Sequence, residues 1–162
     1  MKRAKSILVS LLGLVLFAGC TTTGSDKEVR DLQNPTYNVI KTSQYPQDTK
    51  GDKEFKNYHS DMADEVKDFG EEYKRLTGEE APKFDGNMII AKSGEKRNGG
   101  YKISIASVVD AVRYTEVTIL LENPGKGCMA TMALTNPYVI AQLPDDHKDV
   151  KFIERVITTD CQ

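Results

Sequence analysis

The chain has 162 residues, the length of one average domain, and its 22 Lys and Arg face 24 Asp and Glu, which gives a net charge of −2. Met1 to Gly19 contain three of the positive charges and no acid, so the part from Cys20 (162 minus 19, or 143 residues) has 19 positive charges (22 minus 3) against 24 acids. This acidic balance excludes a nucleic acid as the partner, because nucleic-acid binders need a basic surface that neutralises phosphates.

The N-terminal segment has the pattern of an export signal. Basic residues come first, an apolar run from Ile7 to Gly19 follows, and small residues end it. The run has 13 residues, whereas a membrane-spanning helix needs about 20, so residues 1–19 are predicted to be a signal peptide. The ending Leu16 to Cys20 (LFAGC) resembles the bacterial lipobox, in which the cysteine becomes lipid-modified. In the alternative, an ordinary signal peptide is cut nearby and Cys20 has no special role.

The resemblance to lipoproteins implies several acyl chains on Cys20, and more than one chain gives stable membrane attachment. Thr21 follows the cysteine in place of Asp, which in lipoproteins of this type favours the outer membrane. We therefore expect an outer-membrane lipoprotein of a Gram-negative bacterium, facing the periplasm or the surface. Residues 20–34 are mostly polar and predict a flexible tether, so that the folded domain covers residues 35–162.

The first predicted elements of the domain are a strand and a helix. Thr36 to Lys41 has the composition of a strand. From Phe55 to Leu76, apolar residues recur every three or four positions, which predicts a long amphipathic helix. Asp52 is a suitable N-cap and Gly78 a suitable C-terminal glycine. Gly70 lies inside this helix and costs about 1 kcal/mol relative to Ala.

Alternating apolar and polar residues after Asn87 predict a run of strands. Links such as residues 110–113 have the length of a hairpin and are too short for a crossover between parallel strands. We therefore expect an α+β fold, in which one long amphipathic helix packs on a mainly antiparallel β-sheet or small sandwich. The predicted strands are Met88 to Ala91, Tyr101 to Val109, Tyr114 to Leu121, Tyr138 to Leu143 and Val150 to Ile157.

Cys128 and Cys161 are the two cysteines that remain if Cys20 is lipidated. In an oxidising compartment the simplest interpretation is a disulfide between them, which would close about 33 residues and contribute roughly 3–4 kcal/mol. Two free thiols or a metal pair are the alternatives. A metal site is disfavoured, because the sequence has no C-x-x-C spacing and only two histidines.

No pattern in the sequence indicates catalysis. His59 is predicted on the helix beside its apolar stripe and His147 in a charged run, and neither has a nucleophile or an orienting acid in its sequence context. The glycines between Gly94 and Gly100 lead into a strand, whereas a phosphate-binding loop leads into a helix. We expect two surface histidines, no enzyme activity, no cofactor and no metal.

Three motifs in a fixed order carry a resemblance to a known family. They are Gly94 to Ile105 (GEKRNGGYKISI), Glu122 to Cys128 (ENPGKGC) and Ala133 to Tyr138 (ALTNPY). Together they resemble the PrcB-like C-terminal domain, which shows GEKPTGGYSIEI, PGPGC and TNPY or TSPY in this order. The resemblance covers about residues 84–156, and the preceding helix fits the usual arrangement of that family. This chain has Arg97 in place of a proline and Lys126 inside the PGxGC turn, and neither change should disturb the fold.

The resemblance implies a protein-binding module. The name-giving member of the family is a lipoprotein that associates with a subtilisin-like surface protease and supports its maturation. A direct protease inhibitor, a structural envelope lipoprotein without a protease partner and a hydrolase are the alternatives. The glycine- and proline-rich loops could gather at one end of the sheet and present a contact surface, or they could serve as turns only. The candidate contact residues are Arg97, Asn98, Gly99, Gly100, Tyr101, Pro124, Gly125, Lys126, Gly127, Asn136, Pro137 and Tyr138.

Overall fold

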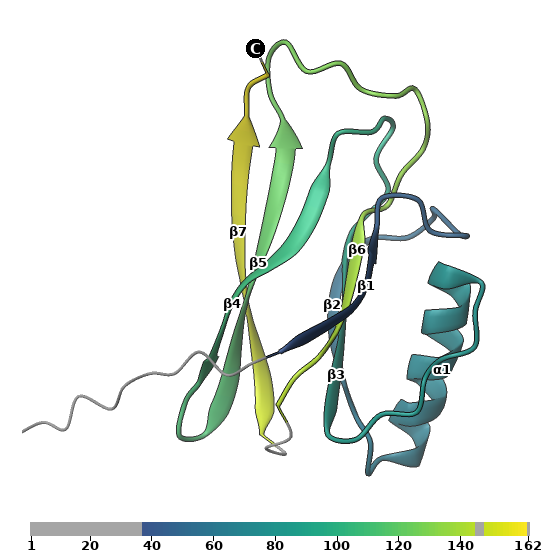
Figure 1. Ribbon diagram of the computed structural model, residues 1–162, viewed down its shortest axis with the longest axis vertical. Coiled ribbons are helices and arrows are strands. Elements are labelled where there is room, and N and C mark those ends of the chain that lie inside the picture. The colour runs from purple at the N-terminus through teal and green to yellow at the C-terminus, as the bar shows by residue number, and fades with distance from the viewer. Residues whose placement is uncertain (1–36, 145–147, 162) are drawn as a thin grey trace, which may run out of the picture. The chain divides into compact units, whose positions relative to one another are not determined.

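The computed structural model describes residues 37–144 and 148–161, all within the unit Leu32–Gln162. This part of the chain forms strands and one helix (Figure 1). In chain order they are β1 (Asn38–Ser43), β2 (Lys53–His59), α1 (Ala63–Thr77), β3 (Asn87–Ser93), β4 (Lys102–Asp110), β5 (Tyr114–Pro124), β6 (Tyr138–Gln142) and β7 (Asp149–Thr159).

The strands form two sheets. The first has the order β1-β6-β3-β2 and is antiparallel throughout, and the second has the order β4-β5-β7. β4 and β5 form the predicted hairpin, but β7 runs parallel to β5, from Tyr114 opposite Asp149 to Pro124 opposite Thr159. A parallel neighbour needs a long crossover, and here the crossover passes through β6 in the other sheet.

The first sheet lies between two cores. On one face, Ile89 and Ala91 of β3 pack with residues of β4 and β5 from the second sheet. On the other face, Met88 and Ile90 pack with Phe69 and other residues of α1. The helix and the second sheet therefore cover opposite faces of the first sheet, as Figure 1 shows. Every residue of β3 is buried, which is expected for a strand covered on both faces.

The predicted fold class, a long helix on a sheet, is wrong. The described residues form mostly strands, in two sheets, with one helix of 15 residues. The segment Phe55 to His59, predicted as helix, belongs to β2. Phe55 packs against Phe152 of β7 and Tyr58 against Phe69 of α1, with ring centroids 5.8 and 5.4 Å apart.

The spacing of these two aromatic residues explains the error. Residues three apart lie on one face of a helix but on opposite faces of a strand. Because β2 has a core on each side, both faces take an apolar residue, and Phe55 and Tyr58 continue the period of the real helix that follows. Periodicity cannot separate these two cases.

The helix ends where the sequence predicts, but it begins later. Gly78 has a left-handed φ of 76°, and its N–H donates to the carbonyl of Lys74, so it closes the helix as predicted. Asp52 is not the N-cap, since that position belongs to Met62, which makes no side-chain capping bond.

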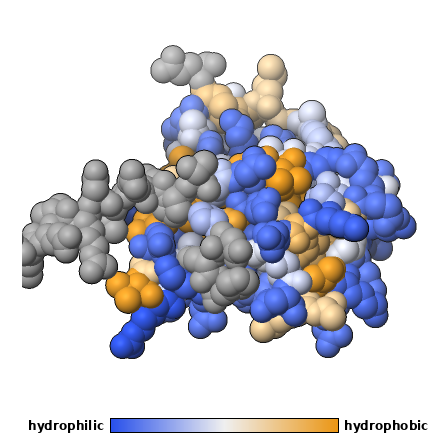
Figure 2. Space-filling model, turned by 60° about the horizontal axis from the view of Figure 1, so that its bottom comes forward, coloured by the Kyte–Doolittle hydropathy of each residue, from blue (hydrophilic) through white to orange (hydrophobic). Residues whose placement is uncertain are grey.

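The strands predicted between Met88 and Ile157 are confirmed, with ends that differ from the prediction by at most three residues. On the face shown in Figure 2, strongly hydrophobic residues form small separate groups among hydrophilic ones. Within residues 37–144 and 148–161, the structure contains no helix with the length and apolar character that crossing a bilayer requires. The predicted signal peptide, the lipidation site Cys20 and the tether (residues 20–34) lie outside the described residues.

Candidate protein-binding loops and a charge network

A disulfide joins Cys128 to Cys161, as predicted, and it ties the loop after β5 to the end of β7. Backbone contacts reinforce this tie. The N–H of Gly125 donates to the carbonyl of Thr159 at 2.9 Å, and the N–H of Cys161 donates to the carbonyl of Lys126 at 3.0 Å. The turn after β5 therefore has a fixed position at the end of the second sheet.

The other two predicted contact loops meet this turn at the same end of the sheets. Gly99 donates its N–H to the carbonyl of Thr131 at 2.8 Å, and the hydroxyl of Thr135 donates to the carbonyl of Asn98 at 3.0 Å. A Cβ on Gly100 would lie 3.2 Å from the side chain of Pro124. The glycine loop thus contacts both neighbouring loops, so the three predicted motifs do gather (Figure 1, top).

The candidate contact residues differ in exposure. The buried ones support the loops from below: the N–H of Asn136 donates to the carbonyl of Gln44, and the carbonyl of Pro137 accepts from Ser93. These residues therefore do not present a surface. The buried candidates are Gly99, Asn136, Pro137 and Tyr138; Asn98, Tyr101, Pro124 and Gly125 are half-buried; Arg97, Gly100, Lys126 and Gly127 are exposed.

The sequence analysis missed the apolar residues that this end exposes. Met129 is 100% exposed, Met132 94% and Leu134 52%, and all three lie between the disulfide and the buried Thr135. Tyr45, from the loop after β1, is 54% exposed, and its hydroxyl lies 3.1 Å from that of Thr131. We call Tyr45, Met129, Met132 and Leu134 the apolar loop surface. The sequence did contain a signal for this surface. An apolar-rich segment lies between two turn motifs, so its side chains do not belong to a strand that would bury them.

One known protein family matches part of this chain. Residues 88–144 match the family described as PrcB C-terminal. The resemblance predicted from the three motifs is thus confirmed over this segment, which is less than half of the chain. No curated protein and no solved structure matches the chain. The PrcB C-terminal segment runs from β3 to β6 and contains the glycine loop, the cysteine turn and most of the apolar loop surface.

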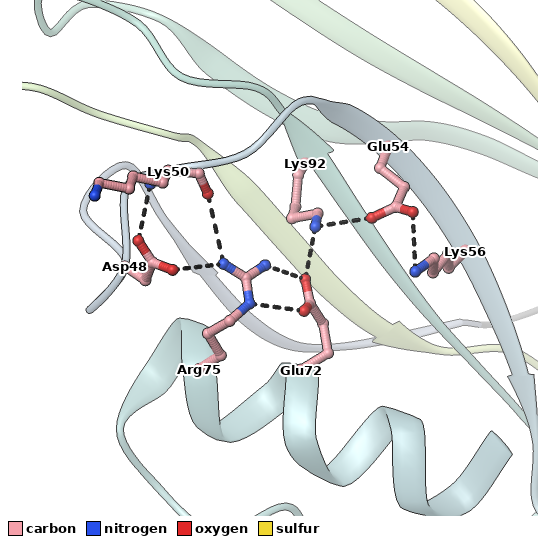
Figure 3. A network of polar contacts seen from close by, with 7 residues as sticks. All are labelled: Asp48, Lys50, Glu54, Lys56, Glu72, Arg75 and Lys92. Atoms are coloured by element: carbon pink, nitrogen blue, oxygen red, sulfur yellow. Dashed lines mark hydrogen bonds and ion pairs between the residues drawn. The ribbon is translucent and has the colours of Figure 1, made fainter. Parts of the chain in front are cut away.

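A charge network on the α1 side of the first sheet was also missed (Figure 3). Lys92, in the buried strand β3, has a side chain only 7% exposed, and its Nζ lies 2.9 Å from Glu54 and 2.7 Å from Glu72. Arg75 of α1 makes two contacts with Glu72, at 2.7 and 2.9 Å, and a third with Asp48 at 3.0 Å. The network therefore holds α1 to β2, β3 and the loop between β1 and β2.

The pKa directions follow from these contacts. Burial opposes ionisation of Glu72, but hydrogen bonds from Arg75 and Lys92 outweigh it and lower the pKa of the Glu72 carboxyl. The pKa of Glu54 is lowered in the same way, because bonds from Lys92 and Lys56 outweigh its partial burial. The hydrogen bonds that Arg75 donates to Glu72 raise the pKa of the Arg75 guanidinium further. Each charge in the network is thus stabilised by a partner of opposite sign.

The prediction for His59 is wrong in two respects. The residue lies on β2, and its side chain is only 20% exposed. Its Nδ1 is 2.8 Å from a Glu65 carboxylate oxygen, and the same oxygen accepts the backbone N–H of His59. An acid that orients the histidine is therefore present six residues away, although the sequence did not predict it. This pair connects the end of β2 to the first turn of α1. His147 lies outside the described residues. Among residues 37–144 and 148–161, no group of three or more His, Cys, Asp and Glu side chains is arranged to hold a metal ion.

Proposed function

We propose that this protein is an exported, lipid-anchored envelope lipoprotein whose folded part binds another protein through the apolar loop surface. The observation that carries the proposal is the exposure of Met129 and Met132 on a loop fixed by the disulfide and by backbone contacts. Single exposed apolar residues are common on monomers, but neighbouring ones on a fixed loop mark a contact surface.

Methionine suits such a surface because its unbranched thioether adapts to the shape of a partner. The loop also loses little conformational freedom when it binds, since its start is fixed at Cys128 and its middle at Thr131. Arg97 and Lys126 are exposed in the two neighbouring loops and supply a polar rim.

The proposed partner is a secreted subtilisin-like protease or its precursor. This part of the proposal rests on the resemblance to the PrcB C-terminal family. Binding would support the stability or maturation of the protease, and it requires no catalytic group in this chain. The anchor part rests on the signal-like segment and on Cys20.

Site-specific crosslinking tests the binding surface. A photo-reactive amino acid replaces Met132 in one variant and Val112 in another, each expressed in intact cells. Val112 is the matched control, because it is also a large, exposed apolar residue (82%) but lies in the β4–β5 hairpin at the other end of the second sheet. We expect position 132 to form a crosslink to a protease precursor that position 112 does not form. Equal crosslinking at both positions, or at neither, contradicts the proposal.

Two further measurements test the remaining parts. Cys20→Ala should release the protein from the membrane fraction, and retention in that fraction would contradict the lipid anchor. A purified complex with the protease should keep protease activity; strong inhibition would instead favour the direct-inhibitor alternative.

A further inference from the structure

A cavity of about 420 Å³ lies between α1 and the segment that leads to β3. It is outside the loops and outside the charge network, and nothing in the proposed function uses it. Phe69 and Phe84 form its aromatic wall, with ring centroids 4.9 Å apart. Its size falls within the range of small-molecule sites in proteins. The lining residues are Ser60, Val66, Phe69, Gly70, Glu80, Ala81, Pro82, Lys83 and Phe84.

Gly70 keeps part of this cavity open. A glycine inside a helix lowers helix stability relative to alanine, so it usually has a packing reason. Here the usual reason is missing, because a Cβ built on Gly70 would have no atom within 4 Å. The missing side chain instead leaves space at the cavity wall, one turn of helix from Val66, which is itself partly exposed.

The rim of the cavity offers a positive charge. Glu80 is neutralised by Lys74, and the hydroxyl of Ser60 accepts the N–H of Gly86. Lys83 is exposed and makes no ion pair with any residue in the described ranges. An apolar floor with an unpaired ammonium at its edge complements a ligand that has an apolar body and one negative charge.

We propose that this cavity binds a small free carboxylate with an apolar chain, such as a medium-chain fatty acid. The chain would lie against Phe69 and Phe84 in the space that Gly70 leaves open, and the carboxylate would pair with Lys83. The site is independent of the proposed protein-binding surface.

Calorimetric titration of the purified protein tests this, with sodium octanoate and 1-octanol as probes of equal chain length. We expect octanoate to bind with a Kd of about 0.1–1 mM and octanol roughly tenfold more weakly. Lys83→Gln should weaken octanoate roughly tenfold and leave octanol unchanged, because only the carboxylate uses the ammonium.

Gly70→Ala separates a ligand site from a structural role. The methyl group should raise the midpoint of thermal unfolding by about 4 °C, because alanine favours the helix and meets no neighbour. It should also weaken octanoate at least fivefold, and Gly70→Val should do so more strongly. Lys67→Ala, at an exposed position of the same helix, is the matched control and should leave binding unchanged. Absence of octanoate binding, or binding that none of the Lys83 and Gly70 variants weakens, overturns the proposal.

Discussion

At Lys92 each charged group touches a group of opposite sign, whereas at Met129 and Met132 apolar side chains face solvent without a partner. Both regions adjoin the glycine loop: Lys92 precedes it in β3, and Gly99 of that loop donates its N–H to Thr131 between the two methionines. The contrast shows that charged and apolar residues serve different purposes in the two regions. The charge network is satisfied within the chain and serves its stability, while the apolar loop surface contributes little to the fold and is available to another molecule.

The largest expected effect comes from the disulfide, which gives the apolar loop surface its fixed position. Replacing both Cys128 and Cys161 by Ser should lower the free energy of unfolding by about 3–4 kcal/mol, since the bond closes a separation of 33 residues. Urea unfolding of the oxidised protein and the double variant measures this difference. A change below about 1 kcal/mol would mean that other contacts fix the loop.

Lys92→Met tests the other region. The variant keeps the length of the side chain but removes the shared cation. Glu72 then retains Arg75 as a partner, and Glu54 retains Lys56. We expect a loss of about 2 kcal/mol, less than for a buried charge left entirely unpaired. Lys56→Met is the matched control, because that side chain is half-exposed, and it should cost at most about 0.5 kcal/mol. Equal losses in the two variants would contradict a special role of burial at Lys92.

The pH dependence of stability tests the charge state of the network. The pKa of Glu72 is lowered from its ordinary value of 4.5, so its contribution to stability is complete above that value and disappears as the pH falls through the lower folded-state pKa. Unfolding measured between pH 6 and pH 3 should show stability falling with acid, and Glu72→Gln should make that fall shallower. Glu71→Gln, its exposed neighbour, should leave the slope unchanged.

The smallest effect on stability is expected at the apolar loop surface. Replacing Met129 and Met132 together by Ser should change the free energy of unfolding by no more than about 0.5 kcal/mol, because both side chains face solvent. The same variant, isolated from intact cells, should no longer co-purify with the partner protease. A large loss of stability would show that these residues pack in the fold and would remove the contrast between the two regions.

Local signals in the sequence predicted part of this fold. The alternation in β4, the link before β5, the helix end at Gly78 and the cysteine pair all depend on neighbouring residues or on simple counting. The three motifs lie together because the loop from β3 to β4 and the loop from β5 to β6 both cross between the two sheets at the same end.

Contacts between segments that are distant in the sequence could not be predicted from local patterns. The start of the helix was misplaced because β2 has a core on both sides. The predicted strand ended at Ala91, so Lys92 was placed outside it, although a lysine in a buried strand must find acids. Its partners Glu54 and Glu72 come from elements that only the sheet order brings together, and the exposure of the methionines depends on which residues the core leaves out.

The parallel pairing of β5 with β7 sets the order in which the molecule can assemble. A chain that emerges from its N-terminus first presents β1 long before β6, its partner in the first sheet, and β5 long before β7 in the second. Closing such distant pairs is slow, since loop entropy is lost before the contacts form. The first sheet is complete only when β6 has emerged and the second only when β7 has, and Cys161 lies beyond β7. Nearly the whole polypeptide must therefore be present before folding can finish, which leaves a window in which chaperones and proteases meet an incompletely folded chain.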